Sequence, residues 1–383
     1  MNLPGALCTA ALLAVTLLGS AGNAIPVTQV AEAGSSSPAD GVTIVMVGDM
    51  LMHMPVLRAG QEADGSYCFD GLFAHVQPQI RSADIAIVNQ ETIMGGEELG
   101  GYTGYPTFNS PYAVGDAEAN AGFDVVLQAT NHALDRSAKG IENCLSFWET
   151  VYPQIAVTGI HESAEDQAEM TILTSGGIRI AVLNYTYGTN GIQMPRGKGY
   201  LVDYLSMDRV RADLERAERE ADFTIVCPHW GIEYSLTPSG DQRQWAAFFA
   251  QEGADLIIGT HPHVIEPLEY LTEGDRQIPV YYSLGNFVNS TAGRGAGVMN
   301  RMVGGMARVN IGRAADGSAV VRKAEVIPLV THLGEGEVTT YFLADYTQEL
   351  AENNRIRLQD STFSLENSRK LTDKVWAGGY SDR

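Results

Sequence analysis

Seven short runs of apolar residues recur along the chain, and each run is continuous rather than alternating between apolar and polar positions. The runs are rich in β-branched side chains. This pattern is typical of β-strands that are covered on both faces, as in a parallel sheet. We therefore expect strands within residues 42–49, 83–91, 123–132, 178–187, 222–231, 254–263 and 278–287.

Amphipathic segments separate several of these runs. In residues 206–221 the apolar side chains of Val210, Leu214 and Ala217 recur at helical spacing, and residues 240–254 form a second segment of this kind. Such spacing predicts helices with one buried face. Strands that alternate with helices indicate a layered α/β fold.

The pattern changes near the C-terminus. Two alternating segments within residues 304–331 flank the sequence "AADGSA", and its Asp-Gly pair predicts a β-hairpin. From residue 339 the chain is charged and helical in pattern, so we expect a helical extension over residues 339–383.

The N-terminus carries a different signal. Residues 1–24 contain no charged side chain, and residues 6–18 form an apolar run of the length of a signal peptide. We expect residues 1–24 to be a signal peptide or an N-terminal membrane anchor. Residues 25–41 are polar and rich in Ser, Ala and Gly, which predicts a flexible linker before the domain that starts near residue 42.

Composition bounds the class of protein. A chain of 383 residues with 45% hydrophobic residues can bury a sizeable core. Its 46 acidic and 25 basic residues give a net charge of −21, which repels nucleic acid at long range. Beyond the leader, Cys68, Cys144 and Cys227 are widely spaced, which favours free buried thiols and leaves one disulfide open.

Polar residues of a restricted set follow the predicted strands. Four of the eight histidines follow directly on strand ends. Because function gathers at the carboxyl ends of strands in α/β sheets, we take these residues as one candidate site. They are Asp49, His53, Asn89, Glu91, Asn131, His132, Asp135, His229, Glu233, His261, His263 and Asn286.

This set of oxygen and nitrogen donors, without cysteine, suits Mn²⁺, Zn²⁺ or Fe²⁺. His261 and His263 are two residues apart with a proline between them, so an extended segment places both imidazoles on one face. The pair can bind one ion or span two ions about 3.5–4 Å apart. We expect a divalent-metal site, with two ions.

Each residue taken alone has a structural alternative. Asp49 can be a helix cap or turn residue, His229 a core histidine, and His53 a loop residue. Glu233 can be a surface carboxylate and Asn286 a turn residue. A shared site is the simpler interpretation, because all these alternatives would otherwise have to hold together.

Six motifs carry a resemblance to a known family. "VGDMLMH", "NQET", "ATNHALD", "PHWGIEY", "GTHPHVIEPLEY" and "YSLGNFV" occur in the order and spacing of the bacterial capsule-synthesis CapA family, or poly-γ-glutamate synthesis proteins, over residues 42–327. That family resembles a divergent branch of the calcineurin-like metallophosphoesterases. The resemblance implies a four-layer α/β/β/α sandwich over residues 42–338, with metal-site residues at the carboxyl ends of the strands.

The resemblance also implies roles. Metal ligation falls to Asp49, Glu91, Asn131, His229, His261 and His263. Catalysis falls to His132 and Asp135, and substrate contacts to His53, Asn89, Glu233 and Asn286. The chain departs from the phosphoesterase pattern at two places, since Asp-x-His becomes Asp49 with His53 and Gly-Asp-x-x-Asp becomes Asn89-x-Glu91. Both changes alter the metal bridge.

Two functions are compatible with these features. The first is an exported protein of capsule or poly-γ-glutamate biosynthesis or export, which acts through a metal-dependent phosphoesterase-like hydrolase site on a phosphate ester or anionic polymer. The second is a non-catalytic envelope accessory factor that binds or helps export an anionic polymer. Both imply an extracytoplasmic protein, secreted or tethered to the membrane, with membrane-bound polymer-synthesis subunits as partners.

Local basic segments are needed if an anionic polymer binds so acidic a chain. Residues 194–200 and 289–301 are the candidates, and ordinary solvent loops are the alternative.

Overall fold

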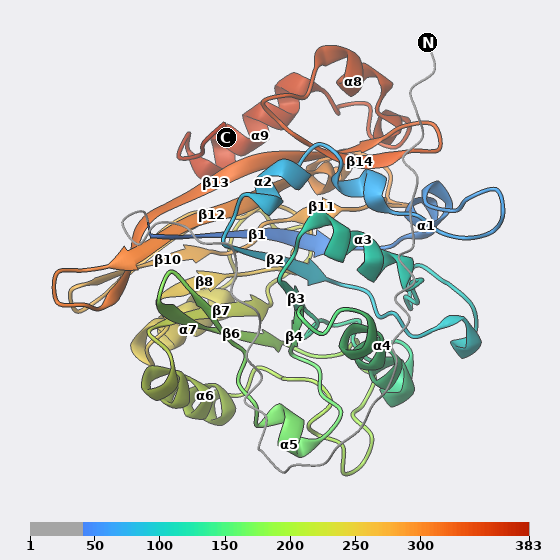
Figure 1. Ribbon diagram of the computed structural model, residues 1–383. Coiled ribbons are helices and arrows are strands. Elements are labelled where there is room, and N and C mark those ends of the chain that lie inside the picture. Colours follow the sequence, from blue (N-terminus) through green and yellow to red (C-terminus); the bar gives the residue numbers. More distant parts are fainter. Residues whose placement is uncertain (1–40, 383) are drawn as a thin grey trace.

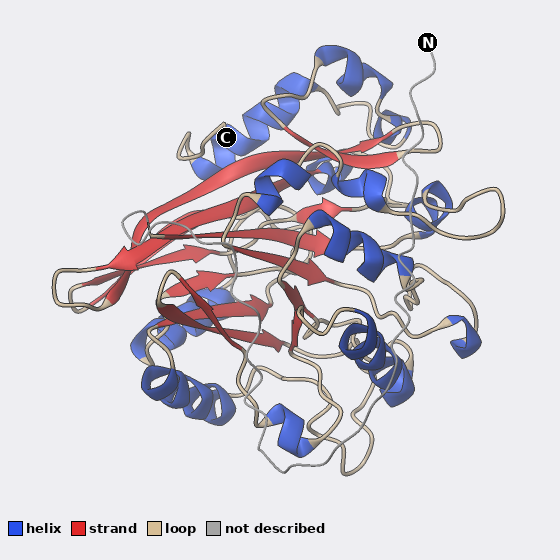
Figure 2. Ribbon diagram, in the orientation of Figure 1, coloured by secondary structure: helices blue, strands red, loops and turns tan. Residues whose placement is uncertain are grey.

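The computed structural model describes residues 41–382, and two β-sheets form its centre (Figures 1 and 2). The first sheet has the order β14-β13-β12-β1-β2-β3-β4, and β11 pairs with β1. From β1 to β4 the strands are parallel, whereas β12 to β14 are antiparallel. Its strands are β1 (Val42–Met50), β2 (Ile85–Gln90), β3 (Val125–Leu127), β4 (Ala156–Thr158), β11 (Asn286–Val288), β12 (Val303–Arg313), β13 (Ala319–Leu333) and β14 (Val338–Phe342).

The second sheet has the order β5-β6-β7-β8-β10-β9. Its four central strands are parallel, and an antiparallel strand borders them on each side. Its strands are β5 (Ile172–Ser175), β6 (Ile178–Thr186), β7 (Phe223–His229), β8 (Leu256–Ile258), β9 (Leu268–Glu273) and β10 (Arg276–Tyr281).

Helices cover the outer faces of both sheets. Figure 1 shows α6 and α7 beyond the second sheet and α8 and α9 beyond β13. The α-helices are α1 (Met54–Ala59), α2 (Gln77–Arg81), α3 (Ala113–Ala121), α4 (Ser137–Val151), α5 (Ala164–Gln167), α6 (Met207–Glu220), α7 (Gly240–Gln251), α8 (Gln348–Asn353) and α9 (Leu365–Trp376). The 3₁₀ helices are η1 (Asp70–Phe73), η2 (Glu97–Leu99), η3 (Val298–Met302) and η4 (Arg355–Leu358).

Alternation of side chains along the strands produces three apolar layers. Ile44 and Ile87 of the first sheet pack with Ile225 and Ile258 of the second, which forms the core between the sheets. The opposite faces pack against helices, as Val88 does in the first sheet. On the second sheet, Val226 packs with the helix residues Val210, Leu214 and Phe249. The predicted four-layer α/β/β/α sandwich is therefore confirmed.

Six of the predicted runs form single strands, but the run 278–287 divides between the two sheets. β10 ends at Tyr281 in the second sheet, and β11 begins at Asn286 in the first. Gly285 lies between them with φ +65°, a conformation that glycine adopts without steric cost. The run thus joins the sheets beside the carboxyl end of β1.

The other predicted elements are found with small differences. The hairpin joins β12 to β13, and Ala314 N donates to Ser318 O across its turn. The predicted helices are α6 and α7, and Ser239 starts α7 with a capping box. The extension predicted as helical, 339–383, begins instead within β14, because residues 338–342 pair with β13.

Two further expectations concern the thiols and the leader. Cys144 and Cys227 are buried and free, as predicted, whereas Cys68 is disulfide-bonded, so the favoured expectation of a free thiol is wrong for Cys68. The predicted leader, residues 1–24, and linker, 25–41, lie outside the described residues except for residue 41. Within residues 41–382, no helix has both the length and the apolar character needed to cross a bilayer.

Candidate metal centre

The strand ends of both sheets meet at one edge and bring the candidate ligands together. Asp49 lies near the end of β1, where the pairing register shifts against both β2 and β11. Such an irregularity re-aims side chains. Glu91 follows β2 directly, His229 is the last residue of β7, and His261 follows β8 closely. Residues separated by more than 200 positions in sequence thus share one site.

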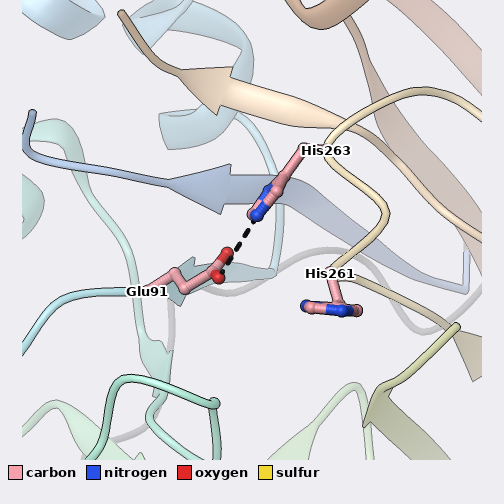
Figure 3. A group of neighbouring side chains, drawn as sticks. All are labelled: Glu91, His261 and His263. Carbon is pink, nitrogen blue, oxygen red and sulfur yellow. Dashed lines mark ion pairs between the residues drawn. The ribbon is translucent and has the colours of Figure 1, made fainter. Parts of the chain in front are cut away.

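The ligand atoms fall into two overlapping groups, in each of which all atoms lie within 4.8 Å of one another. One group contains Glu91, His261 and His263, and the other contains Asp49, Glu91 and His229. Figure 3 shows Glu91 facing the imidazole of His263, with His261 beside them on the same loop as His263. Glu91 belongs to both groups, so its carboxylate is the element that the two groups share.

Unpartnered polar atoms indicate what these groups bind. Both carboxylate oxygens of Glu91 and Nδ1 of His261 are buried without a hydrogen bond. The imidazole nitrogens nearest to Glu91 are Nε2 of His229 at 3.4 Å and Nε2 of His263 at 3.6 Å. A buried carboxylate without a partner is strongly destabilising, whereas a cation would satisfy it. The residues present therefore fit a divalent metal ion.

Asp49 differs from Glu91 because its oxygens are already hydrogen bonded. Asn89 Nδ2 donates to Oδ1 at 2.9 Å, and the backbone N of His261 lies 3.1 and 3.2 Å from the two oxygens. His263 Nδ1 lies 3.0 Å from Oδ2. A carboxylate has further lone pairs for a cation, so Asp49 can both fix the histidine loop and act as a ligand.

The histidine loop has an unusual backbone. His261 has φ 98° and His263 has φ 59°, on either side of Pro262. These are left-handed values that residues with a Cβ rarely adopt, and such strain gathers at functional sites. The bonds to Asp49 hold the loop in this conformation.

Charge within the centre is unevenly distributed. Burial raises the pKa of Glu91 well above its usual range. Burial would lower the pKa of His263, but Glu91 and Asp49 prevail and raise it to about 9. The pKa of Asp49 is lowered, because His263 outweighs the effect of burial. Burial lowers the pKa of His229 to about 3 and that of His261 well below its usual value, so both imidazoles are neutral and have a lone pair to offer.

Two neighbours fix the ring of His229. Thr260 Oγ1 lies 3.0 Å from Nδ1, and Asn131 Oδ1 lies 3.0 Å from Nε2. Asn131 Oδ1 accepts, so Nε2 carries the hydrogen while it bonds to Asn131. A cation at Nε2 would take the place of that hydrogen, and the ring would then be protonated at Nδ1, where Thr260 Oγ1 can accept. Asn131 is thus within the centre, as the resemblance implies.

The predicted catalytic pair is formed. His132 Nδ1 lies 2.7 Å from Asp135 Oδ2, and the backbone N of Phe108 donates to the same oxygen at 2.6 Å. Asn190 Nδ2 lies 3.5 Å from the other ring nitrogen, Nε2. Asp135 therefore orients the ring of His132.

A cavity of about 660 Å³ opens beside the centre, and we call it the first cavity. His132, His263, His53 and Glu233 line its wall together with Arg301. Desolvation lowers the pKa of His53 to about 4, so this ring is neutral at pH 7. The predicted substrate-contact residues His53 and Glu233 are thus placed where a substrate can reach them.

Asn89 and Asn286 do not line the first cavity, and their predicted contact with substrate stays a prediction. Asn89 donates to Asp49, and Asn286 Nδ2 donates to the carbonyl oxygens of His263 and Arg301. Both amides lie behind the site. Their amide nitrogens position Asp49 and the histidine loop, whereas the oxygen Oδ1 of each amide is buried without a hydrogen bond.

From the sequence, Arg301 was a candidate only as part of a basic segment, and Tyr187 was not a candidate. Arg301 lies in the candidate segment 289–301, and its guanidinium carbon lies 3.6 Å from the ring centroid of Tyr234. The ring of Tyr187 lies 4.7 Å from that of His261. Tyr187 ends the predicted run 178–187, so its position was the available signal. The other basic segment, 194–200, does not line the first cavity, and its Lys198 pairs with Glu142 at 3.4 Å.

Residues 43–291 match the model of the family described as "Bacterial capsule synthesis protein PGA_cap". The chain belongs to this family. Over 270 residues it is 28% identical to the PGA biosynthesis protein CapA of Bacillus subtilis (strain 168). This alignment covers 65% of this chain and 63% of the relative. Over 256 residues it is 28% identical to the capsule biosynthesis protein CapA of Bacillus anthracis. This alignment covers 64% of this chain and 59% of the relative.

The match therefore spans about 60% of the length of these two PGA_cap relatives. Among solved structures, the chain is similar to the calcineurin-like phosphoesterase YfkN from Bacillus subtilis, with a TM-score of 0.41 and 12% identity. That alignment covers 86% of this chain and 99% of the other.

Proposed function

We propose that this member of the PGA_cap family is a metal-dependent hydrolase of phosphoesterase type that acts in capsule or poly-γ-glutamate biosynthesis. The observation that carries the proposal is the unpartnered carboxylate of Glu91 among buried imidazoles. The oriented pair of His132 and Asp135 lies on the same cavity wall and supports a catalytic use of the centre.

The ligand groups suggest two cation positions. Asp49, Glu91 and His229, with Asn131 nearby, would hold one ion, and Glu91, His261 and His263 the other. The mixture of oxygen and imidazole donors suits Mn²⁺, Zn²⁺ or Fe²⁺. Bound ions of this kind lower the pKa of water and offset the charge of a phosphoryl group.

The chain's own residues would handle the proton and the substrate. Asp135 fixes Nδ1 of His132, so Nε2 is the atom that can give a proton to the leaving group. Arg301 on the cavity wall can bind an anionic group of the substrate in two-point fashion. His53 and Glu233 complete the wall and define its shape.

The proposal includes a substrate class and a location. A phosphate ester or an anionic polymer is the expected substrate, and membrane-bound polymer-synthesis subunits are the expected partners. The charge-free, apolar pattern of residues 1–24 supports an extracytoplasmic protein, secreted or tethered to the membrane. The names of the two Bacillus relatives support the role in capsule or poly-γ-glutamate synthesis.

A non-catalytic accessory factor is the second candidate. It is favoured by Asn89, which stands where the phosphoesterase pattern has an aspartate and donates a hydrogen bond to Asp49 instead of offering a carboxylate. In that case the centre would bind metal and an anionic polymer without turnover.

The deciding experiment measures metal content and the hydrolysis of bis(p-nitrophenyl) phosphate with and without Mn²⁺. We expect bound metal and Mn²⁺-dependent hydrolysis, and a loss of about 100-fold in turnover for His132→Gln with metal content unchanged. His75→Ala is the matched control, because His75 stacks on Tyr341 away from the cavity. Bound metal without hydrolysis would support the accessory role, and absence of metal would refute both.

A further inference from the structure

The first cavity continues into a second one. A cavity of about 440 Å³ adjoins it, and Pro55, Ser290, Arg294 and Gln359 line both. The second cavity is bordered by Arg58 on one side and by η4 residues of the C-terminal segment on the other. Together they form a single groove that leads from His132 and His263 to η4, and we call it the long groove.

The charge of the long groove is opposite to that of the chain. Four arginines line it, namely Arg58, Arg294, Arg301 and Arg355, against the two carboxylates of Glu233 and Glu337. In the whole chain, 46 acidic residues outnumber 25 basic ones. A local reversal of this kind focuses an attractive potential for anions.

The arginines of the long groove are not used within the protein as ion-pair partners. Among residues 41–382, none of the four lies within ion-pair distance of a carboxylate, whereas Arg209, Arg211 and Arg216 on α6 all do. Arg301 donates to Thr291 Oγ1 and packs on Tyr234, which fixes its position at the junction. Arg58, Arg294 and Arg355 are exposed. Their guanidinium groups are therefore available to a ligand.

We propose that the long groove binds an extended chain that carries one carboxylate or phosphate per repeat, with one repeat at the metal centre. The proposal rests on the proposed function for the role of that centre. The first cavity alone has the volume of a site for a small ligand. The arginines of the second cavity come from α1, the loop before η3, and η4, so successive repeats rather than one small ester can reach them. Guanidinium groups bind carboxylate and phosphate alike.

The test measures binding by competition against a fluorescent glutamate decamer in the metal-loaded, full-length protein. Competitors are glutamate oligomers of two, five and ten residues and phosphate chains of matching length. We expect affinity to rise by roughly tenfold or more from the dimer to the decamer in at least one series, because added repeats bind without a new loss of translational freedom. The series that shows this rise identifies the chemistry of the repeat.

Variants locate the effect. Arg58→Gln with Arg355→Gln should lower decamer affinity about threefold to tenfold and leave dimer affinity and hydrolysis of the small diester unchanged. Arg369→Gln on α9 is the control, because Arg369 is an arginine outside the long groove. Equal affinity for dimer and decamer in both series, or full decamer affinity in the double variant, would overturn the inference. Failure of small-diester hydrolysis in the wild type would instead count against the proposed function, since binding is measured separately.

Discussion

Two buried clusters of histidine and carboxylate occur in the described part of the chain, and they differ in one respect. In the cluster around His161, Nε2 lies 2.7 Å from Asp203 Oδ2, and Nδ1 lies 3.6 Å from Asp166 Oδ2. Gln167 donates to the other oxygen of Asp203 at 2.8 Å. In the metal centre, by contrast, both oxygens of Glu91 have no hydrogen-bond partner.

The number of hydrogen-bond partners, rather than the types of residue, therefore separates a structural ion cluster from a ligand site. Both clusters contain imidazoles that are no more than 8% exposed, at His161 and His263. In the His161 cluster the protein supplies the opposing charges itself. In the metal centre both oxygens of Glu91 lack a hydrogen bond and have imidazoles only at 3.4 and 3.6 Å, so a bound cation would satisfy them better than the protein does.

The largest effect should come from removing a neutral imidazole of the metal centre. We expect His229→Ala or His261→Ala to lower Mn²⁺ affinity and hydrolysis at least about 1000-fold, since loss of a direct ligand exceeds the 10–100-fold typical of residues behind the ligands. Titration calorimetry and diester turnover measure the two quantities. Undiminished Mn²⁺ binding in both variants would show that these two imidazoles are not metal ligands.

The opposite result is expected in the other cluster. His161→Ala should lower the free energy of unfolding by about 3 kcal/mol and leave Mn²⁺ affinity unchanged, because the buried carboxylate of Asp203 loses its nearest cationic partner and keeps only Gln167 and the more distant Arg209. Asp166 and Asp203 outweigh burial and raise the folded pKa of His161 to about 9, above the ordinary 6.5. The stabilisation is therefore complete below pH 6.5 and is lost as pH rises through about 9.

Denaturant unfolding from pH 6 to pH 10 tests this dependence. The stability difference between wild type and His161→Ala should shrink across that range. A constant difference would contradict the assigned charge of His161.

A smaller effect is expected from the residue behind His229. Thr260→Val removes the hydroxyl that lies 3.0 Å from Nδ1 and should weaken Mn²⁺ binding about tenfold, because the ring loses its fixed orientation. Thr331→Val is the control, since its hydroxyl also makes a buried hydrogen bond, to Phe287 O, away from the centre. Equal Mn²⁺ affinity in the two variants would remove the positioning role of Thr260.

The smallest effect concerns a third buried carboxyl group, that of Glu118 in α3. Neither of its oxygens has a hydrogen-bond partner, and burial raises its pKa well above the ordinary 4.5. Because the folded pKa is raised, the folded state loses stability as pH rises from 4.5 to the folded value, and the loss is complete above that value. Glu118→Gln should therefore match the wild type near pH 4 and be about 1–2 kcal/mol more stable at alkaline pH.

Thermal unfolding of both proteins over that pH range measures the difference. Parallel curves for wild type and Glu118→Gln would show that the carboxyl is not buried in the folded protein. Unlike Glu91, Glu118 has no imidazole near it, so added Mn²⁺ should leave its effect unchanged.

Local sequence was sufficient for most of the fold. Continuous β-branched runs predicted the strands, because a strand that is buried on both faces has apolar side chains at successive positions. The division of run 278–287 was missed because the change of sheet depends on a positive φ at Gly285, which the apolar pattern does not encode. Strand β14 was missed because its pairing partner, β13, supplies the stabilisation.

Residues of the candidate site could be predicted from sequence only where they follow the end of a predicted strand. Glu91, His229, His261 and His263 were found because each follows an apolar run. Asn131 and His229 lie 98 positions apart in sequence. Their hydrogen bond depends on the tertiary fold, so local sequence does not reveal it. The donors of Asn89 and Asn286 could not be placed from sequence, because composition does not tell whether a donor faces a cavity or the protein.

The backbone of the histidine loop has a consequence for ion selectivity. A residue held in such a conformation costs about 1–3 kcal/mol, and His261 and His263 both have positive φ. This cost is met during folding through the bonds to Asp49, so the two imidazoles are preorganised before any ion arrives. A loop that does not adapt its shape favours ions whose preferred coordination geometry it already matches, and it disfavours larger, irregularly coordinated ions such as Ca²⁺.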